Sequence, residues 1–488
     1  MVIESLKYKI LQLFGFAPTQ EQGQALDTFV SFMTDRDPQA VMILRGSAGT
    51  GKTSLSGSIV RTLLQIRQKV MLLAPTGRAA KVFSLGSGAP AYTIHRRIYR
   101  EKAFAGVDGQ FGLNDNLYTD TLFMVDEASM IANMGLGGTT FGSGCLLDDL
   151  VKFVYQGHND RLLLIGDKAQ LPPVGEEESP ALSASVMEGY GLKVYECDLN
   201  EVLRQSQSSG ILYNATLIRQ MITHDAVTGL PLIRFKGFAD IVMMPGAELV
   251  ESLGDSYRHV GMDETMVITR SNKRANIYNN GIRNMVLDRE EELSSGDMLM
   301  IVKNNYFWTE KEKKESGEGS AGAVPAFLAN GDRAKVLRVS NYIELYGFRF
   351  ATLLLQLPDY DDYEMQVTGM LDTLQSEAPA LTHEQQEELF RQVEEDYQHF
   401  VPLKADRMKS IRQDAYFNAL QIKYAYAVTC HKAQGGQWAH VYVDQGYMTD
   451  DMLTPDYIHW LYTAFTRATD KLFLVNWPKE QTCEPTDL

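Results

Sequence analysis

The chain of 488 residues is too long for a single hydrophobic core, and about three or four folding units are expected. Its net charge of −16 argues against a basic coat for nucleic acid, so binding of that kind requires a local groove. The four cysteines form no CxxC pair, which argues against a disulfide framework or a metal knuckle and suits a reducing, cytoplasmic setting. No apolar run approaches the ~18 residues that cross a bilayer, so a soluble protein without membrane association is expected.

The first segment, residues 1–17, has the spacing of an amphipathic helix. Ile3, Leu6, Ile10 and Phe14 recur at intervals that place them on one helical face. The segment lacks the pattern of a signal-peptide cleavage site. We interpret it as a helix that packs on the following domain.

A phosphate-binding motif follows at residues 46–53. The pattern GxxxxGK[ST] comes after a strand-like run, residues 40–44, and precedes a helix-like segment, residues 54–65, which is the context the motif requires. Backbone N–H groups and the helix N-terminus can hold phosphates there, with Lys52 on the β- and γ-phosphates and Thr53 on Mg²⁺. The predicted nucleotide-binding residues are Gly46, Ser47, Ala48, Gly49, Thr50, Gly51, Lys52 and Thr53.

The region from Thr19 to Leu203 alternates short apolar runs with helical patterns. The runs end at polar motifs, which is typical of a parallel α/β sheet with its chemistry at the carboxyl ends of the strands. They lie at residues 41–44, 69–73, 121–125 and 161–165. Residues 96–118 interrupt this alternation with glycines and aromatic residues, and favour a hairpin rising from the sheet.

Two of these strands end at residues suited to ATP hydrolysis. Asp126 can hold Mg²⁺ through its water shell, and Glu127 can orient or deprotonate the attacking water. Gln170, in the polar loop that follows residues 161–165, can hydrogen-bond the γ-phosphate. Together with the phosphate motif, these side chains favour hydrolysis over simple nucleotide storage.

The second half of the chain contains another α/β pattern with an insertion. A strand at residues 264–269 and a helix at 272–287 begin it, and it resumes near Lys423 and continues to Val475. Between these parts, short antiparallel strands are predicted at residues 298–303, 333–339, 348–357 and 363–371, which indicate a small β-barrel. An acidic helix is expected at 382–400, and mobile loops at 309–322 and 135–144.

The phosphate motif, Asp126-Glu127 and the run Gly166-Asp167-Lys-Ala-Gln170-Leu-Pro-Pro occur in an order that resembles the superfamily 1 DNA helicases, specifically the RecD-like and Dda-like branch. The resemblance extends from Thr19 to about Val475. It implies ATP and Mg²⁺ as cofactors and single-stranded, forked or tailed duplex DNA as partners, in a chain that works as a monomer in DNA repair or recombination.

The resemblance also assigns roles around the nucleotide. Gln22 would read the adenine edge, and Arg204 and Arg467 would reach the γ-phosphate as arginine fingers, since guanidinium places bidentate positive charge on the phosphoryl oxygens. Gly435 belongs to a motif that couples the second motor domain to both strand and nucleotide.

A second set of residues would contact the DNA strand. In the first motor domain, hydroxyl, imidazole and backbone groups at strand or loop ends can donate to phosphates. The residues implied across both motor domains are Pro75, Thr76, Arg78, Thr93, His95, Asn272, Thr429, His431 and Lys432.

The fold class expected is therefore α/β, with two RecA-like P-loop domains. The first, residues 18–200, carries a pin at about 96–118; the second comprises residues 201–290 and 421–488 and receives an SH3-like β-barrel with a helical rim at 291–420. The function implied is a DNA helicase that moves 5′ to 3′ and separates duplex. Alternatives left open are a strand-stimulated ATPase or switch that does not unwind, an RNA-directed helicase, and a small-molecule kinase.

Overall fold

The computed structural model describes residues 2–105, 108–135, 142–201, 208–223, 229–316, 324–325, 327–401, 403–449 and 452–483. The chain divides into two compact units, residues 1–245 with 433–488 and residues 246–432. Among the described residues, no helix combines the length and apolar character needed to span a membrane.

The first unit is built on a six-stranded sheet of order β3-β2-β6-β7-β1-β8. All neighbouring strands pair in parallel, as the alternating pattern predicts. The strands are β1 (Ala40–Gly46), β2 (Lys69–Ala74), β3 (Ala91–Thr93), β6 (Thr121–Val125), β7 (Arg161–Gly166) and β8 (Lys193–Leu199). β1 lies between β7 and β8, so the phosphate motif begins at an interior strand of the sheet.

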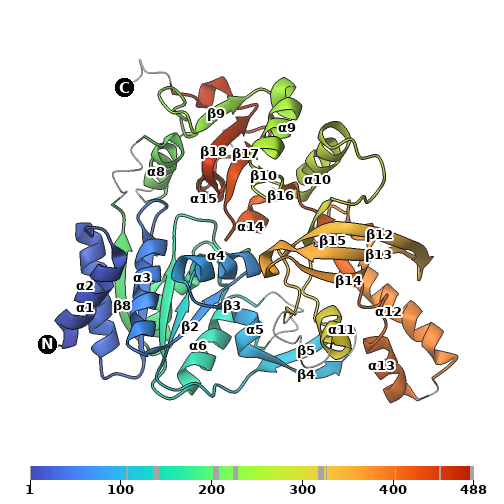
Figure 1. Ribbon diagram of the computed structural model, residues 1–488, viewed down its shortest axis with the longest axis horizontal. Coiled ribbons are helices and arrows are strands. Elements are labelled where there is room, and N and C mark those ends of the chain that lie inside the picture. Colours follow the sequence, from blue (N-terminus) through green and yellow to red (C-terminus); the bar gives the residue numbers. More distant parts are fainter. Residues whose placement is uncertain are drawn as a thin grey trace. The chain divides into compact units, whose positions relative to one another are not determined.

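Helices cover both faces of this sheet (Figure 1). One core cluster joins the sheet to the first four helices through residues such as Ile10, Phe29 and Ile59, and the other joins it to the remaining three through Ile94, Phe153 and Met187. The helices are α1 (Val2–Phe14), α2 (Gln20–Thr34), α3 (Lys52–Gln65), α4 (Gly77–Ser87), α5 (Ile94–Ile98), α6 (Leu146–Gln156) and α7 (Ala184–Gly189). The burial of Ile10 and Phe14 confirms α1 as a packing helix.

The predicted hairpin is present. β4 (Tyr99–Ala105) and β5 (Asp108–Leu113) form a separate two-stranded antiparallel sheet. Its tip, residues 106–107, lies outside the described residues, as does most of the glycine-rich segment 135–144.

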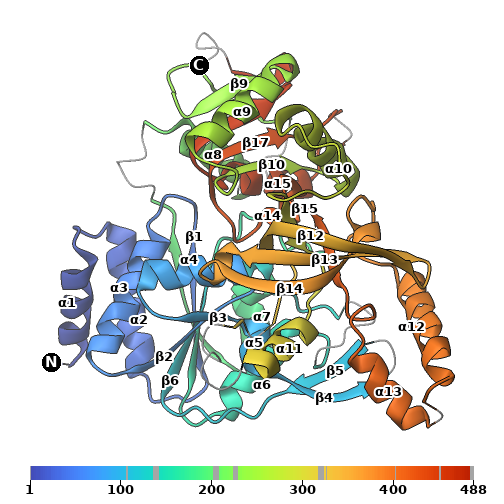
Figure 2. The ribbon, with the colours of Figure 1, turned by 45° about the vertical axis from the view of Figure 1, so that its right-hand side comes forward.

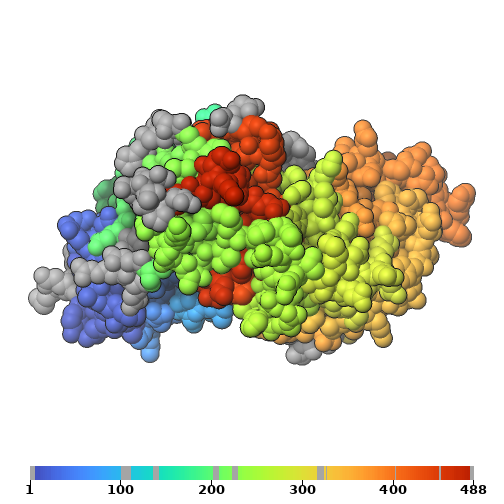
Figure 3. Space-filling model, turned by 90° about the horizontal axis from the view of Figure 1, so that it is seen from above, coloured from blue at the N-terminus to red at the C-terminus, as the bar shows by residue number. Residues whose placement is uncertain are grey.

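The same unit contains part of the second α/β pattern. β18 pairs in parallel with both β9 and β17, and in the space-filling view the red C-terminal segment lies against the green segment that contains β9 (Figure 3). The elements are α8 (Gly210–Thr223), β9 (Ile241–Met244), β17 (Trp438–Asp444), α15 (Pro455–Phe465) and β18 (Ala468–Val475).

The second unit combines a short parallel pair with a closed five-stranded barrel. The parallel pair and its helices are α9 (Leu249–His259), β10 (Thr265–Thr269), α10 (Asn272–Gly281), a π-helix (Ile282–Val286), β16 (Ala427–Thr429) and the short α14 (Cys430–Ala433) at the boundary of the unit. The barrel strands are β11 (Met298–Ile301), β12 (Arg333–Leu345), β13 (Phe348–Leu357), β14 (Tyr363–Met370) and β15 (Leu420–Tyr424); β12, β13 and β14 lie side by side (Figure 2). The fold class predicted, parallel α/β sheets with an inserted β-barrel, is confirmed.

Details of the insertion differ from the expectation. β15 pairs with β11 and β14, so the barrel includes residues that the predicted boundary at 420 left in the motor domain. The predicted helix 272–287 ends as a π-helix. Two helices form the rim, α12 (His383–Gln398), as predicted, and α13 (Lys404–Arg412).

The polar segment at 309–322 is only partly as expected. Residues 309–316 belong to the helix α11 (Phe307–Ser316), so the prediction of a mobile loop is wrong there; residues 317–323 lie outside the described part. The helix is anchored by Trp308, a buried residue whose Nε1 donates to Asn418 O at 2.9 Å. This tertiary contact overrides the polar, glycine-rich composition of the segment.

Candidate nucleotide-binding site

The phosphate motif forms a loop between β1 and α3. Gly49 and Gly51 have φ values of +77° and +80°, a left-handed conformation that glycine adopts without strain. Gly51 is the N-cap of α3 and offers no side-chain cap, so the first N–H groups of the helix are available to an anion. A Cβ at Gly46 would lie 2.9 Å from Lys52 Cγ, so only glycine lets the lysine fold over the loop.

Lys52 is half-buried within this loop. Its Nζ donates to the carbonyl oxygens of Gly46 and, at 2.9 Å, Ser47, while the adjacent Thr53 is exposed. The ammonium and the helix N-terminus thus concentrate positive charge at one point, as the motif predicts.

Asp126 and Glu127 follow β6, which pairs with β2 and β7. The backbone of Asp126 is fixed by an N–H bond to Leu73 O at 3.0 Å, and Glu127 N donates to Asp126 Oδ1 at 2.9 Å. Glu127 has a positive φ of 52°, which turns the chain sharply after the strand. The two carboxylates therefore occupy adjacent positions at the end of the sheet that also carries the phosphate loop.

The electrostatics of the pair fit a divalent cation. Burial and the charge of Glu127 raise the pKa of Asp126 well above its usual range, and the charge of Lys52 partly opposes the shift. A half-buried carboxylate pair with excess negative charge is stabilised by a cation, and Mg²⁺ needs only one or two protein oxygens when phosphates supply others. Thr53 and Asp126 are the residues that would hold it; among the residues the structure describes, no cluster of three metal-ligating side chains occurs.

Gln170 lies in the loop that follows β7. Its side chain is buried, and its Oε1 has no hydrogen-bond partner. A buried amide oxygen without a partner is costly, and such groups are concentrated at functional sites. The expectation that Gln170 acts on the γ-phosphate stays a prediction.

Helix α15 contacts both the phosphate loop and the loop after β7. Ala48 N donates to the Tyr462 hydroxyl at 3.0 Å, and this hydroxyl donates to Asp167 Oδ2 at 2.7 Å. Leu171 N donates to Thr463 Oγ1 at 2.8 Å, and Gln434 Nε2 donates to Leu171 O at 2.7 Å. The sequence analysis assigned no role to Tyr462, Thr463 or Gln434.

An arginine that sequence reasoning missed also contacts the phosphate loop. Arg219, on α8, donates through Nη1 to Ser47 Oγ. It lies in an amphipathic helix outside any recognisable motif, so the sequence held no signal for it.

The two predicted arginine fingers have different outcomes. Arg204 lies outside the described residues. Arg467 is buried, and its guanidinium donates to Thr463 O at 3.0 Å, Gly436 O at 3.0 Å and Thr466 Oγ1 at 3.1 Å. These partners belong to the C-terminal segment and not to the phosphate loop, so a finger role requires Arg467 to change partners and stays a prediction.

Gln22 supports the phosphate loop from α2. Its Nε2 donates to Thr50 O at 2.9 Å, and its Oε1 accepts from Thr19 N at 3.0 Å in a capping box. The side chain therefore positions the loop here, and recognition of adenine stays a prediction.

The strand-contacting residues predicted in the first unit lie at helix starts. Thr76 caps α4 and Thr93 caps α5, and Pro75 directly follows β2. Burial lowers the pKa of His95 to about 4, so its imidazole is neutral at physiological pH and can donate a hydrogen bond without carrying charge.

The segment around Gly435 packs against α4. Gly435 has a φ of +72°, and a Cβ there would lie 3.1 Å from both Ala79 Cβ and Thr76 Oγ1. Arg78 Nη2 donates to Gln437 O at 2.6 Å, and its guanidinium lies 4.8 Å from the centroid of the Trp438 ring. Gly435 is thus brought to the predicted strand-binding residues of α4; a contact with nucleotide stays a prediction.

The second unit holds the remaining predicted residues. Asn272 starts α10, Thr429 ends β16 directly opposite Thr269, and His431 is exposed on α14. Burial and the charge of nearby Lys423 lower the pKa of Lys432 to about 8. Burial alone lowers the pKa of Lys423, and an anion placed close to Lys432 would favour its charged form.

Comparisons with known proteins agree with this geometry. An AAA domain family matches residues 17–229, and a UvrD-like helicase C-terminal domain family matches residues 424–475. The ATP-dependent RecD2 DNA helicase of Deinococcus radiodurans is 29% identical over 157 residues, 32% of this chain and 18% of that protein. The ATP-dependent DNA helicase dda of phage T4 is 25% identical over 267 residues, 53% of this chain and 55% of that protein. The chain belongs to the superfamily 1 helicases, in the branch of RecD and Dda.

Other similarities of this helicase-family chain extend along most of its length. An uncharacterized protein of Methanocaldococcus jannaschii, MJ1519, is 24% identical over 493 residues, which cover 93% of this chain but 38% of that protein. A crystal structure of the Pif1 helicase of Bacteroides with ADP-AlF3 and single-stranded DNA aligns over 96% of this chain and 95% of its own, with a TM-score of 0.45 and 13% identity.

Proposed function

We propose that the protein is an ATP-dependent DNA helicase that moves along single-stranded DNA from 5′ to 3′ and separates duplex. The observation that supports it most is that two α/β patterns contact one phosphate loop. Lys52 belongs to the loop, whereas Arg219 on α8 and Tyr462 on α15 reach it from the second α/β pattern. A nucleotide held there interacts with both halves, so its hydrolysis can shift their relative positions.

Hydrolysis is assigned to the side chains at the ends of β6 and β7. Lys52 neutralises the phosphates, Glu127 orients or deprotonates the attacking water, and Gln170 contacts the γ-phosphate. Bound Mg²⁺ supplies positive charge to the phosphate oxygens, with Thr53 and Asp126 as its protein ligands. Arg204 or Arg467 stabilises the charge that develops during phosphoryl transfer.

The DNA strand is assigned to helix starts and to one cationic site. Thr76, Thr93 and neutral His95 donate hydrogen bonds to phosphates, and Lys432 contributes charge. Few aromatic side chains accompany these groups, so we expect little sequence preference and a steep loss of affinity with salt.

The proposals that the protein separates duplex DNA and moves from 5′ to 3′ rest on the family resemblance. RecD2 and Dda are named DNA helicases. The hairpin β4–β5 lies between His95 and the Asp126-Glu127 pair, where the family resemblance implies a pin. The closed barrel, inserted between β10 and β16, is our candidate for the SH3-like domain that the family resemblance implies.

The deciding experiment compares forked DNA carrying a 5′ tail with forked DNA carrying a 3′ tail, each with ATP and Mg²⁺. We expect separation of the 5′-tailed fork by the wild-type protein and loss of both hydrolysis and separation in Lys52→Ala, which should remain folded by circular dichroism. Retained separation in Lys52→Ala contradicts the site assignment, and separation of only the 3′-tailed fork contradicts the direction.

The same assay distinguishes the alternatives. Hydrolysis stimulated by single strands without separation of either fork indicates a translocase or switch. Stimulation by RNA but not by DNA indicates an RNA-directed enzyme. Hydrolysis that no oligonucleotide raises favours a small-molecule kinase or a related P-loop enzyme.

A further inference from the structure

The hydroxyl of Tyr462 joins two loops of the nucleotide site. Tyr462 is only 1% exposed, and its hydroxyl accepts from Ala48 N in the phosphate loop and donates to Asp167 Oδ2 in the loop after β7. Burial and the Asp167 carboxylate raise the pKa of Tyr462 well above its usual value, so the phenol remains a donor at every working pH.

Asp167 in turn orders the loop that carries Gln170. Its Oδ1 accepts from Ala169 N at 3.0 Å, while Gln170 N donates to Asp167 O at 3.2 Å. The carboxylate is 4% exposed, so its hydrogen bonds are made with protein groups and not with bulk water. The position of Gln170 relative to the phosphate loop is therefore set through the Tyr462 hydroxyl.

The same helix holds this loop at its backbone. The His459 ring contacts Ala169 O through Nδ1 at 2.9 Å, and Thr463 Oγ1 accepts from Leu171 N at 2.8 Å. Residues 459, 462 and 463 lie on one face of α15 because helical neighbours three and four apart share a face. Gln170 lies between the two loop residues that this face binds at the backbone.

We propose that Tyr462 is a positioning residue for ATP hydrolysis, whose hydroxyl aligns the phosphate loop with the Asp167–Leu171 loop and so lets the C-terminal half control turnover. The inference rests on the proposed ATPase function. The ring itself fills space that phenylalanine fills equally well, so the role belongs to the oxygen atom. No family comparison assigns it, and the contact joins residues 414 positions apart.

The test is Tyr462→Phe, compared with Tyr457→Phe as a matched control. Tyr457 lies on the same helix, is 2% exposed, and its hydroxyl donates to Gln445 Oε1 at 2.5 Å, outside both loops. We expect Tyr462→Phe to lower kcat for strand-stimulated ATP hydrolysis by ~10²-fold, because small misplacements of catalytic groups have effects of this size. Nucleotide affinity, measured with a fluorescent ATP analogue, should change little, and Tyr457→Phe should turn over like the wild type.

Asp167→Asn is the second variant in the test. It removes the charge of residue 167, but its amide oxygen can still accept a hydrogen bond from the Tyr462 hydroxyl. We expect a smaller loss of kcat than in Tyr462→Phe. The loss in the double variant should be smaller than the product of the two single losses, since both changes act on the contact between Tyr462 and Asp167. The inference is overturned if Tyr462→Phe keeps the wild-type kcat, even with a lowered thermal midpoint, or if the effects of Tyr462→Phe and Asp167→Asn on kcat multiply. A wild-type protein that hydrolyses no ATP contradicts the proposed function instead.

Discussion

Lys432, a predicted strand-contacting residue, lies close to a second lysine, Lys423. Burial lowers the pKa of Lys423 to about 8, and burial with the charge of Lys423 lowers that of Lys432 to about 8. Below that pH the Lys432 ammonium is charged and can pair with a phosphate. Above it the free protein has lost the proton, and binding must restore it.

We therefore predict that affinity for single-stranded DNA falls as pH rises from 7 to 9, approaching tenfold per pH unit above 8 for one proton taken up. Fluorescence anisotropy with a labelled oligonucleotide at fixed salt measures this. Lys432→Arg should flatten the profile, because guanidinium stays protonated throughout. A profile that is unchanged in Lys432→Arg but flattened in Lys423→Arg assigns the titration to Lys423.

Arg467 and Arg219 differ in the groups that their guanidinium groups contact. Arg467 is held by oxygens of its own segment, whereas Arg219 already contacts Ser47 of the phosphate loop. Both are candidates for the positive charge that phosphoryl transfer needs.

We predict that Arg467→Lys leaves ATP binding largely intact and lowers kcat by ~10³-fold, as loss of an arginine finger does. Single-turnover hydrolysis and a separate binding titration check it, with Arg219→Ala measured in parallel. A large loss of kcat in Arg219→Ala together with wild-type turnover in Arg467→Lys moves the finger role to Arg219.

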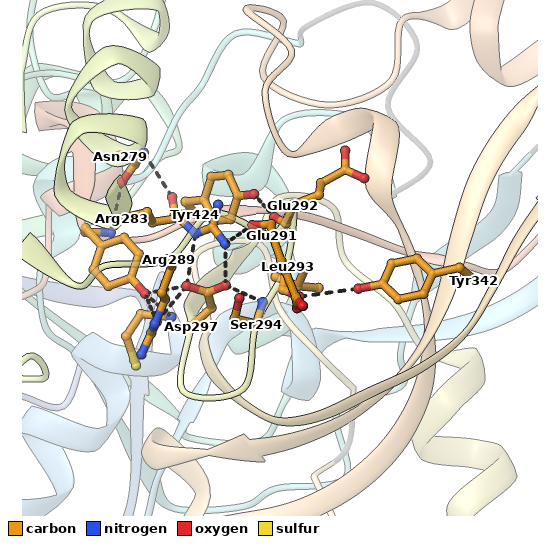
Figure 4. A network of polar contacts seen from close by, with 12 residues as sticks. Asn279, Arg283, Arg289, Glu291, Glu292, Leu293, Ser294, Asp297, Tyr342 and Tyr424 are labelled. Atoms are coloured by element: carbon orange, nitrogen blue, oxygen red, sulfur yellow. Dashed lines mark hydrogen bonds and ion pairs between the residues drawn. The ribbon is translucent and has the colours of Figure 1, made fainter. Parts of the chain in front are cut away.

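At the scale of elements, a buried ion-pair network joins the π-helix to the barrel (Figure 4). Asp297, fully buried just before β11, accepts from Arg283 Nε at 3.1 Å, Arg289 Nη1 at 2.7 Å and the Tyr426 hydroxyl at 2.8 Å. Asn279, on α10, accepts from the backbone of Tyr426 through its Oδ1. The network therefore holds together the segment that enters the barrel before β11 and the segment that follows β15.

Removing the Asp297 carboxylate should destabilise the folded protein, because Arg283 and Arg289 then lose their buried counter-charge. We predict that Asp297→Ala lowers the free energy of unfolding by roughly 3–5 kcal/mol. Urea denaturation followed by circular dichroism measures the change. Glu388→Ala, which breaks an exposed pair with Arg391, should lower the free energy of unfolding far less, because water screens exposed ion pairs. Equal effects in both variants contradict the role of the network.

The whole chain divides into two compact units, each of which can unfold separately if few contacts join them. The phosphate loop and the helices that contact it lie in the first unit, and the barrel lies in the second. A ligand stabilises the part of a protein to which it binds.

We predict more than one transition in differential scanning calorimetry. A non-hydrolysable ATP analogue with Mg²⁺ should raise the transition of the first unit, with a gain of about 2.7 kcal/mol at a ligand concentration of 100 times Kd. Lys52→Ala should abolish that shift. A single transition that moves as a whole indicates that the units unfold cooperatively.

Local sequence patterns were sufficient to predict many of the strands, helices and loops of this protein. The phosphate loop, the Asp126-Glu127 pair and the flanking strands were predictable, because each is encoded by contiguous residues whose spacing satisfies a local requirement. The antiparallel strands of the barrel and the rim helix α12 were predictable for the same reason. The predicted domain boundaries and most residue roles remain predictions.

The tertiary structure decided what local patterns do not encode. α11 forms where composition favours a loop because Trp308 is anchored on Asn418, and β15 joins the barrel because its partners are β11 and β14. Tyr462 meets Ala48 across 414 positions and Arg219 meets Ser47 across 172. Contacts at such separations depend on how the chain folds back on itself, and a single sequence contains no periodicity or motif that records them.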